Sequence, residues 1–322
     1  MTYRTYISIV LILLVVPQVF FAQDPPTPQP AGPMVELSLI VTDKDRKSLK
    51  SLSKDNIRIV EDRVEQTVLR VERDDRPIDY GLLIDSSNSL RRFIGAAVEA
   101  AKVIVTNRRG SDEIFIESFI SSDKIVTLHD FSTDNNALLE SLKLIRIEGG
   151  QSAIVDALYL AAQHVAEHNK TVANRRKALV IITDGEDRNS QHKFDNLMTL
   201  LREQRIQVFA IGLVMDLDKE SGYIGKSPRK KAEKLLNTLT EETGGRVFYP
   251  KTGPEMVEGI AEIITDLRSQ FRVTYQSSNT VNKGFRKVDV KLISPSGERR
   301  DAIVPRGYYV GGSSQSKDQK SK

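Results

Sequence analysis

The 322-residue sequence contains no cysteine. This absence excludes disulfide bonds, thiol catalysis and a lipid anchor on cysteine. An exported chain without cysteine suits a bacterial envelope better than a disulfide-built extracellular domain. An excess of positive charge is also missing, because the formal net charge is only +4 and the lysines and arginines are spread along the chain. We therefore expect a solvated surface and no nucleic-acid partner.

Several signatures of enzymes and nucleotide-binding proteins are absent too. No G-x-G-x-x-G follows the first strand of the central region, Gly149-Gly150 is too short for a phosphate loop, and no serine lies in a Gly-x-Ser-x-Gly elbow. His164 and His168 are four residues apart, but they lack the His-Glu-x-x-His order of a zinc site, so a solvated helix face is expected there. These absences favour a protein that is not an enzyme.

Long apolar runs are confined to the first residues. Arg4 supplies a positive start, and Ile7–Val16 is apolar apart from Ser8, which is short for a membrane span. The pattern predicts a signal peptide over residues 1–22 and a proline-rich linker over 23–34, and thus a secreted, periplasmic or cell-envelope protein. Because Phe20 is bulky for a cleavage site, an uncleaved anchor remains the alternative, and it is the one way in which the chain would be held at a membrane.

Residues 77–270 alternate between strand and helix patterns, which is typical of a doubly wound, mostly parallel α/β sheet. The close pair 113–119 and 124–128 predicts a hairpin whose second strand runs antiparallel. The expected strands are 80–84, 113–119, 124–128, 178–183, 207–212 and 246–249, and the expected helices are 90–107, 137–145, 153–168, 194–203, 230–243 and 254–269.

The flanking segments 35–76 and 271–310 read as short strands without helical periodicity. Each has too few strands to bury a core alone. We therefore predict that they pack together as a small antiparallel β-sandwich into which the α/β domain is inserted. The polar residues 311–322 are expected to form a disordered tail.

Oxygen-bearing side chains gather where predicted strands end. The apolar run Tyr80–Ile84 stops at Asp85, and Ser87 and Ser89 follow in alternation; a second apolar run ends at Thr183-Asp184-Gly185, and Ser152 precedes a helix. An Asp and Ser pair alone also fits a helix cap. Asp85, Ser87, Ser89, Ser152 and Asp184 together offer five hard oxygen ligands on three loops, which suit Mg²⁺, Mn²⁺ or Ca²⁺.

These elements resemble the metal-ion-dependent adhesion site of von Willebrand factor type A domains. The resemblance implies that the first and fourth strands are neighbours, that Ser87, Ser89 and Ser152 bind the ion directly, and that Asp85 and Asp184 act through water or hydrogen bonds. It also implies a protein partner whose Asp or Glu completes the coordination. Ser152 replaces the family's threonine and keeps its hydroxyl.

The flanks resemble a bacterial family, described mainly from Acidobacteria, in which a type A domain lies between such segments. That family has an E-D-G-like turn early and R-x-G-Y late. Here the turn is Glu61-Asp62-Arg63, without the glycine, and the late segment is Arg306-Gly307-Tyr308-Tyr309.

Two other functions remain open on the residues alone. A phosphatase of the haloacid-dehalogenase type would use Asp85 as nucleophile, but its acid/base position holds Ser87, which cannot donate a proton readily near neutral pH. The second open function is that of a subunit that recruits a partner enzyme and has no catalytic activity of its own.

Two segments near the site carry further charge. Glu186 and Asp187 either line the rim of the site or open the next helix. The insertion 215–229 contains Asp216-x-Asp218-x-Glu220, which lacks the spacing of a calcium loop and is expected to be a solvated loop.

Overall fold

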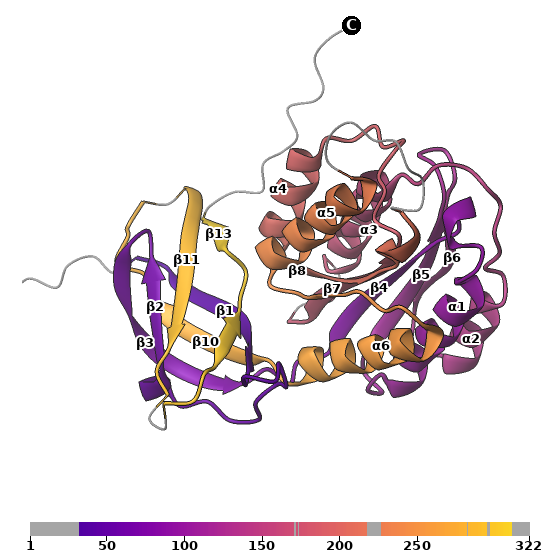
Figure 1. The fold of residues 1–322 in the computed structure, drawn as a ribbon. Helices are drawn as coiled ribbons and strands as arrows, with labels where there is room; N and C mark the ends of the chain where they lie inside the picture. Colours follow the sequence, from indigo (N-terminus) through magenta and orange to yellow (C-terminus); the bar gives the residue numbers. More distant parts are fainter. Residues whose placement is uncertain are drawn as a thin grey trace, which may run out of the picture.

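The computed structural model describes residues 32–170, 172, 174–217, 227–281, 283–294 and 297–310. The predicted signal peptide, most of the linker and the predicted tail lie outside these residues. Figure 1 shows an α/β unit and a β unit side by side, joined where α6 (Gly253–Arg268) leads into β10 (Phe271–Gln276). No helix in the described ranges is both long and apolar enough to cross a membrane.

The α/β unit is built on a six-stranded sheet in the order β6-β5-β4-β7-β8-β9. All neighbours pair in parallel except β5 and β6, which form the predicted antiparallel hairpin. The predicted first and fourth strands, β4 and β7, are neighbours. The strands are β4 (Ile78–Asp85), β5 (Glu113–Phe119), β6 (Ile125–Ser132), β7 (Arg176–Thr183), β8 (Ile206–Gly212) and β9 (Val247–Phe248).

Helices cover both faces of this sheet and give it two cores (Figure 1). Successive residues of β4 serve opposite cores, since Leu82 packs with the first and Leu83 with the second, and this explains the unbroken apolar run of the strand. One face carries α1 (Ile94–Asn107), α2 (Asn135–Leu142) and α6, and the other carries α3 (Ile154–His168), α4 (Phe194–Gln204) and α5 (Pro228–Thr243).

The N- and C-terminal segments form one antiparallel sheet in the order β12-β1-β10-β3-β2-β11-β13. Because β10 pairs with both β1 and β3, neither segment holds a complete sheet, as predicted. The sheet curls over a single small core instead of stacking as two sheets, and a register shift between Thr274 and Tyr275 adds to its bend. The remaining strands are β1 (Met34–Thr42), β2 (Ile57–Glu61), β3 (Val64–Arg73), β11 (Gly284–Leu292), β12 (Asp301–Ile303) and β13 (Gly307–Val310).

A buried carboxylate joins the two halves of the β unit. The Glu61 carboxylate accepts hydrogen bonds from Tyr275 Oη (2.6 Å), Ser277 Oγ (2.6 Å), Arg286 Nη1 (2.7 Å) and Tyr308 Oη (2.8 Å). Burial alone would raise the pKa of Glu61, but these hydrogen bonds outweigh it and hold the pKa below its ordinary value of 4.5. The early Glu61-Asp62-Arg63 turn and the late Arg306-Gly307-Tyr308-Tyr309 segment thus meet at one site.

Backbone geometry explains one glycine of these motifs and the lack of another. A Cβ at Gly307 would lie 2.1 Å from the carbonyl oxygen of Arg286, so only glycine fits this strand contact. In the turn between β2 and β3, Asp62 and Arg63 have φ angles of 47° and 72°. Arg63 therefore occupies the left-handed conformation that the missing glycine would adopt without strain.

The chain enters and leaves the α/β unit at one place. The amide of Asp74, after β3, donates to the carbonyl of Gln270, before β10, at 2.9 Å. Arg73 Nη1 donates to the Ser269 carbonyl at 3.1 Å. The α/β unit is therefore connected to the β unit by two adjacent segments that are hydrogen-bonded to each other. Its sheet can form without interrupting the sheet of the β unit.

We expect Glu61→Gln to lower the free energy of unfolding by about 3 kcal/mol, because it leaves the buried Arg286 guanidinium without its counter-charge. Urea denaturation at pH 7 measures the effect. Glu65→Gln is the matched control: Glu65 pairs with Arg58 at the exposed surface, and the change should be within about 0.5 kcal/mol.

The same comparison has a pH dependence. Since the folded-state pKa of Glu61 is lowered, its ionised form stabilises the fold above about pH 4.5, and this contribution is lost as the pH falls through the folded-state pKa. The difference in unfolding free energy between the wild type and Glu61→Gln should become smaller below pH 4.5. An equal difference at pH 7 and pH 3.5 would contradict the role assigned to the ionised carboxylate.

Candidate metal centre

The two predicted aspartates lie together at the carboxyl ends of the neighbouring strands β4 and β7. Ile84 and Ile182 are register partners in this parallel pair, so Asp85 lies level with Thr183, and Asp184 follows one residue farther along the chain. Thr183, the last residue of β7, donates its hydroxyl to Asp85 Oδ2 at 2.7 Å. Thr183 is not among the predicted site residues; the sequence feature that indicates it is a hydroxyl at the end of the strand next to Asp85.

The three predicted serines are within hydrogen-bonding distance of this edge or of one another. Asp85 Oδ1 accepts the amide of Ser87 at 2.9 Å, and its Oδ2 accepts Ser152 Oγ at 2.9 Å. Ser87 Oγ lies 3.0 Å from both Ser152 Oγ and Ser89 Oγ. Asp85, Ser87 and Ser152 are buried, whereas Ser89 is exposed. The cluster of three serine hydroxyls is therefore accessible to solvent on the side of Ser89.

The loop after β4 is shaped for this contact and not for capping a helix. Ser87 makes no side-chain cap bond, and a short 3-10 turn spans Asn88–Leu90. The helix α1 therefore begins at Ile94, not at Leu90 as predicted. The hydroxyls of Ser87 and Ser89 face each other instead.

A second loop holds Ser152 in place. The carbonyl of Ser152 accepts the amides of Arg188 (2.9 Å) and Asn189 (3.3 Å). Asp187 Oδ1 accepts the amides of Ile154 and Val155, at 2.8 and 3.3 Å. Asp187 thus caps the first turn of α3, a role that the sequence pattern does not predict, and it couples the Asp184 loop to the Ser152 loop.

The electrostatics of this group favour a cation. Burial, reinforced by the negative charge of Asp184, raises the pKa of Asp85 to about 6, although Thr183 and Ser87 donate hydrogen bonds to it. No ion pair within the described part of the chain includes Asp85 or Asp184. Two adjacent carboxylates without a counter-charge, next to three hydroxyls, match the hard oxygen donors that Mg²⁺, Mn²⁺ or Ca²⁺ prefers.

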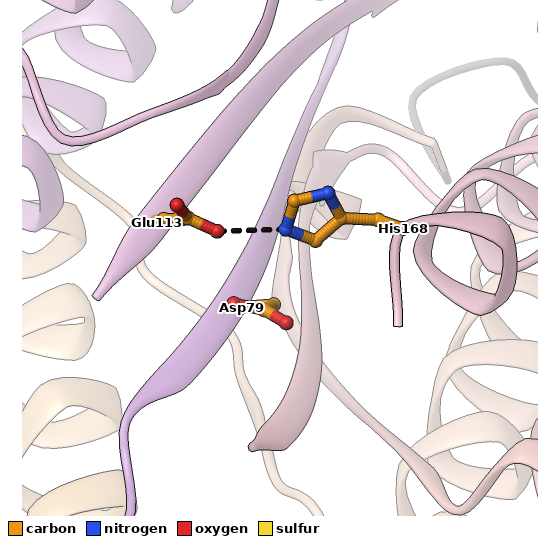
Figure 2. A group of neighbouring side chains, drawn as sticks. All are labelled: Asp79, Glu113 and His168. Atoms are coloured by element: carbon orange, nitrogen blue, oxygen red, sulfur yellow. Dashed lines mark hydrogen bonds and ion pairs between the residues drawn. The ribbon is translucent and has the colours of Figure 1, made fainter. Parts of the chain in front are cut away.

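A second cluster of side chains that could bind a metal lies at the other end of the strands, near the amino ends of β4 and β5. Asp79, Glu113 and His168 place one ligand atom each within 4.8 Å of one another. Figure 2 shows the His168 ring facing Glu113, with Asp79 beside them, and His168 Nε2 is 2.7 Å from Glu113 Oε2. The helix face predicted to be solvated thus holds a histidine that is engaged with a carboxylate.

The oxygens of Asp79 already have partners. Arg175 Nε is 2.5 Å from Asp79 Oδ1, and Asn169 Nδ2 is 2.8 Å from Oδ2. Burial raises the pKa of Asp79 in spite of the Arg175 charge. A metal ion here would compete with a guanidinium that already balances the charge, so the Asp85 group is the better cation site.

Two further histidines and Asp216 of the predicted insertion are engaged elsewhere. His164 Nε2 is 2.8 Å from Asp130 Oδ1, and His192 Nδ1 is 2.7 Å from Asp156 Oδ1. Asp216 pairs with Arg92 at 2.5 Å. Residues 218–226, and with them most of the predicted insertion, lie outside the described residues.

Comparison with solved structures finds similar folds at low identity. A von Willebrand factor type A protein from Catenulispora acidiphila is 12% identical, with a TM-score of 0.48, and the match covers 87% of this chain and 73% of that one. An aerotolerance-related membrane protein from Bacteroides fragilis is 19% identical, with a TM-score of 0.45 and coverage of 58% and 98%.

Two curated relatives match a shorter stretch. The ATP-dependent DNA helicase II subunit 2 of Aspergillus sojae and that of Aspergillus oryzae are each 32% identical over 115 residues, or 35% of this chain. The match spans only 15% of the length of either relative.

A family model covers the α/β unit. The model for the von Willebrand factor type A domain matches residues 79–262, which is more than half of the chain. The matched segment includes both strand ends and all five predicted site residues. The chain therefore belongs to the von Willebrand factor type A domain family.

Proposed function

We propose that this protein is a divalent-metal-dependent protein-binding module whose metal centre is the Asp85 group. The observation that carries the proposal is the buried Asp85 carboxylate, which lies beside Asp184, has no ion-pair partner among the residues that the structure describes, and is hydrogen-bonded to serine hydroxyls. A bound Mg²⁺ or Mn²⁺ would supply a positive charge that these side chains leave only partly neutralised.

Each side chain has a distinct part in this proposal. The hydroxyls of Ser87, Ser89 and Ser152 would hold the ion, because they converge and carry no charge. Asp85 orients Ser152 and the Ser87 amide through its two oxygens, and Asp184 adds negative charge from the neighbouring strand. A partner's Asp or Glu carboxylate would approach from the side of Ser89, where the group is exposed.

We propose in addition that the chain is exported and is not an enzyme. Export rests on the Met1–Ala22 pattern, and the lack of catalysis rests on Ser87, a poor proton donor at the acid/base position of a phosphatase. Membership of the flanked bacterial subfamily is supported by the contact between Glu61 and Tyr308, because it unites the two motifs on which the resemblance depends.

Isothermal titration of the purified protein with Mg²⁺ and with Mn²⁺ tests the metal centre. We expect one site in the wild type and affinity reduced by about 10- to 100-fold in Asp85→Asn and in Asp184→Asn, since both carboxylates act by orienting or charging the hydroxyl group. Circular dichroism should show that both variants remain folded.

His168→Gln is the control that separates the two candidate metal groups. It should leave the Mg²⁺ affinity unchanged, because His168 belongs to the Asp79 group. If Mg²⁺ affinity is unchanged in both aspartate variants but is lost in His168→Gln, the metal binds at the Asp79 group and the proposed centre is refuted.

Ser87→Asp distinguishes binding from phosphatase chemistry. If the site only binds metal and protein, the new carboxylate of this variant adds a charged ligand. The variant should then bind Mg²⁺ about tenfold more tightly and should not hydrolyse p-nitrophenyl phosphate. A phosphatase would gain its missing acid and hydrolyse the ester faster. Hydrolysis by the wild type that vanishes in Asp85→Asn would overturn the proposal that the protein is not an enzyme.

A further inference from the structure

The Asp79 group, formed by Asp79, Glu113 and His168, is held by two strands and a helix. Asp79 of β4 and Glu113 of β5 are register partners in a parallel pair, so their side chains leave the same face of the sheet side by side. His168 is the last residue of α3, the helix that covers this face. Side chains on strands and helices are more precisely positioned for a ligand than those on loops.

The ring of His168 has a fixed orientation. It stacks on Phe131, with the ring centroids 3.8 Å apart and the ring planes 9° apart. Its Nε2 points at Glu113 Oε2, which is 2.7 Å away (Figure 2). Because the ring is already ordered by this stacking, it loses little conformational entropy when its nitrogen binds a ligand.

One arginine lies beside the two carboxylates, and it neutralises only one of them. Arg175 Nε is 2.5 Å from Asp79 Oδ1. Its Nη2 donates to the Ser111 carbonyl at 2.8 Å and lies 3.7 Å from Glu113 Oε2, too far for a hydrogen bond. With a neutral His168, one negative charge therefore remains in the group for a bound cation to neutralise.

The hydrogen bonds of Asp79 do not prevent it from binding a metal ion. A carboxylate offers about four lone-pair positions on its two oxygens, and Arg175 Nε and Asn169 Nδ2 use one on each oxygen. Carboxylates that bind metal ions are themselves hydrogen-bonded by neighbouring groups, which orient them. Arg175 and Asn169 would have this orienting part.

The group is closed on the side of Asp79 and open on the side of the other two residues. The Asp79 side chain has no exposed surface, whereas those of His168 and Glu113 are 21% and 27% exposed. An ion can therefore enter past His168 and Glu113, and water can fill a fourth ligand position. One imidazole nitrogen with two carboxylate oxygens suits Zn²⁺, whereas Mg²⁺ prefers oxygen ligands alone.

We propose that Asp79, Glu113 and His168 bind a zinc ion through one atom each. These three atoms lie within 4.8 Å of one another. Zinc ligands lie about 2.0–2.1 Å from the ion and thus about 3.3 Å apart in a tetrahedral site, so side-chain shifts of about 1 Å suffice. The ion would fasten the end of α3 to the starts of β4 and β5. This site is independent of the proposed function, because it shares no residue with the Asp85 group.

Titration of the full-length protein with Zn²⁺ in competition with a chromophoric chelator tests the proposal, with excess Mg²⁺ present to occupy the Asp85 group. We expect one Zn²⁺ site in the wild type. His168→Gln and Glu113→Gln should each weaken Zn²⁺ binding about tenfold or more, because each removes one ligand. Zn²⁺ should also raise the Tm of the wild type but not that of either variant. Circular dichroism without Zn²⁺ checks that the variants are folded, and either variant alone is sufficient for the test.

His164→Gln is the matched control. His164 lies one turn earlier on α3, stacks on the same Phe131 ring and is paired with Asp130, but it is not part of the Asp79 group. This variant should bind Zn²⁺ as the wild type does. Asp85→Asn should also keep the Zn²⁺ site, even where its Mg²⁺ affinity is reduced, and this separates the site from the proposed metal centre.

Three results would overturn the zinc site. The first is a wild type that does not bind Zn²⁺, and the second is equal Zn²⁺ affinity in the wild type, His168→Gln and Glu113→Gln. The third is a loss of Zn²⁺ binding in His164→Gln or in Asp85→Asn as large as the loss in His168→Gln, which would place the ion outside the Asp79 group.

Discussion

The parallel pairing of β4 with β7 is the constraint on which both ends of the molecule depend. Its register places Ile84 opposite Ile182 and Ile78 opposite Arg176. At the carboxyl ends, this alignment brings Asp85 within hydrogen-bonding distance of Thr183 and close to the charge of Asp184. At the amino ends, the same register aligns Asp79 with Lys177, and Asp79 belongs to the second group that could bind a metal. One strand pair therefore carries a candidate metal group at each end.

The β unit contributes the second constraint, because it closes only when both ends of the chain are present. Its strand β10 comes from the C-terminal segment and lies between two strands of the N-terminal segment, β1 and β3. The buried Glu61 carboxylate binds residues from the C-terminal segment alone: Tyr275, Ser277, Arg286 and Tyr308. Since a buried arginine without its carboxylate is strongly destabilising, this network selects the correct pairing of the two segments.

Much of the α/β unit could be predicted because its signals are local. Continuous apolar runs mark buried parallel strands, and oxygen ligands directly after two such runs indicate one edge of the sheet. This pattern predicts Asp85, Ser87, Ser89 and Asp184, whereas Ser152 is predicted from its place before a helix. The structure brings these side chains together. Thr183 and the capping role of Asp187 were missed because they depend on which loops touch across the edge. The curled form of the β unit was missed because strand patterns do not reveal how a sheet closes.

The contact between the two units shows a deeper limit of sequence patterns. Arg175 and Arg176 directly precede the apolar part of β7, and the local sequence does not predict that Arg176 is buried. The β unit covers the strand starts with β1 and β13, which leaves Arg176 almost without solvent contact. Burial converts an ordinary arginine into a donor that lacks an acceptor. The burial of Arg176 thus depends on contacts between parts of the chain that are far apart in sequence, and a local pattern does not reveal it.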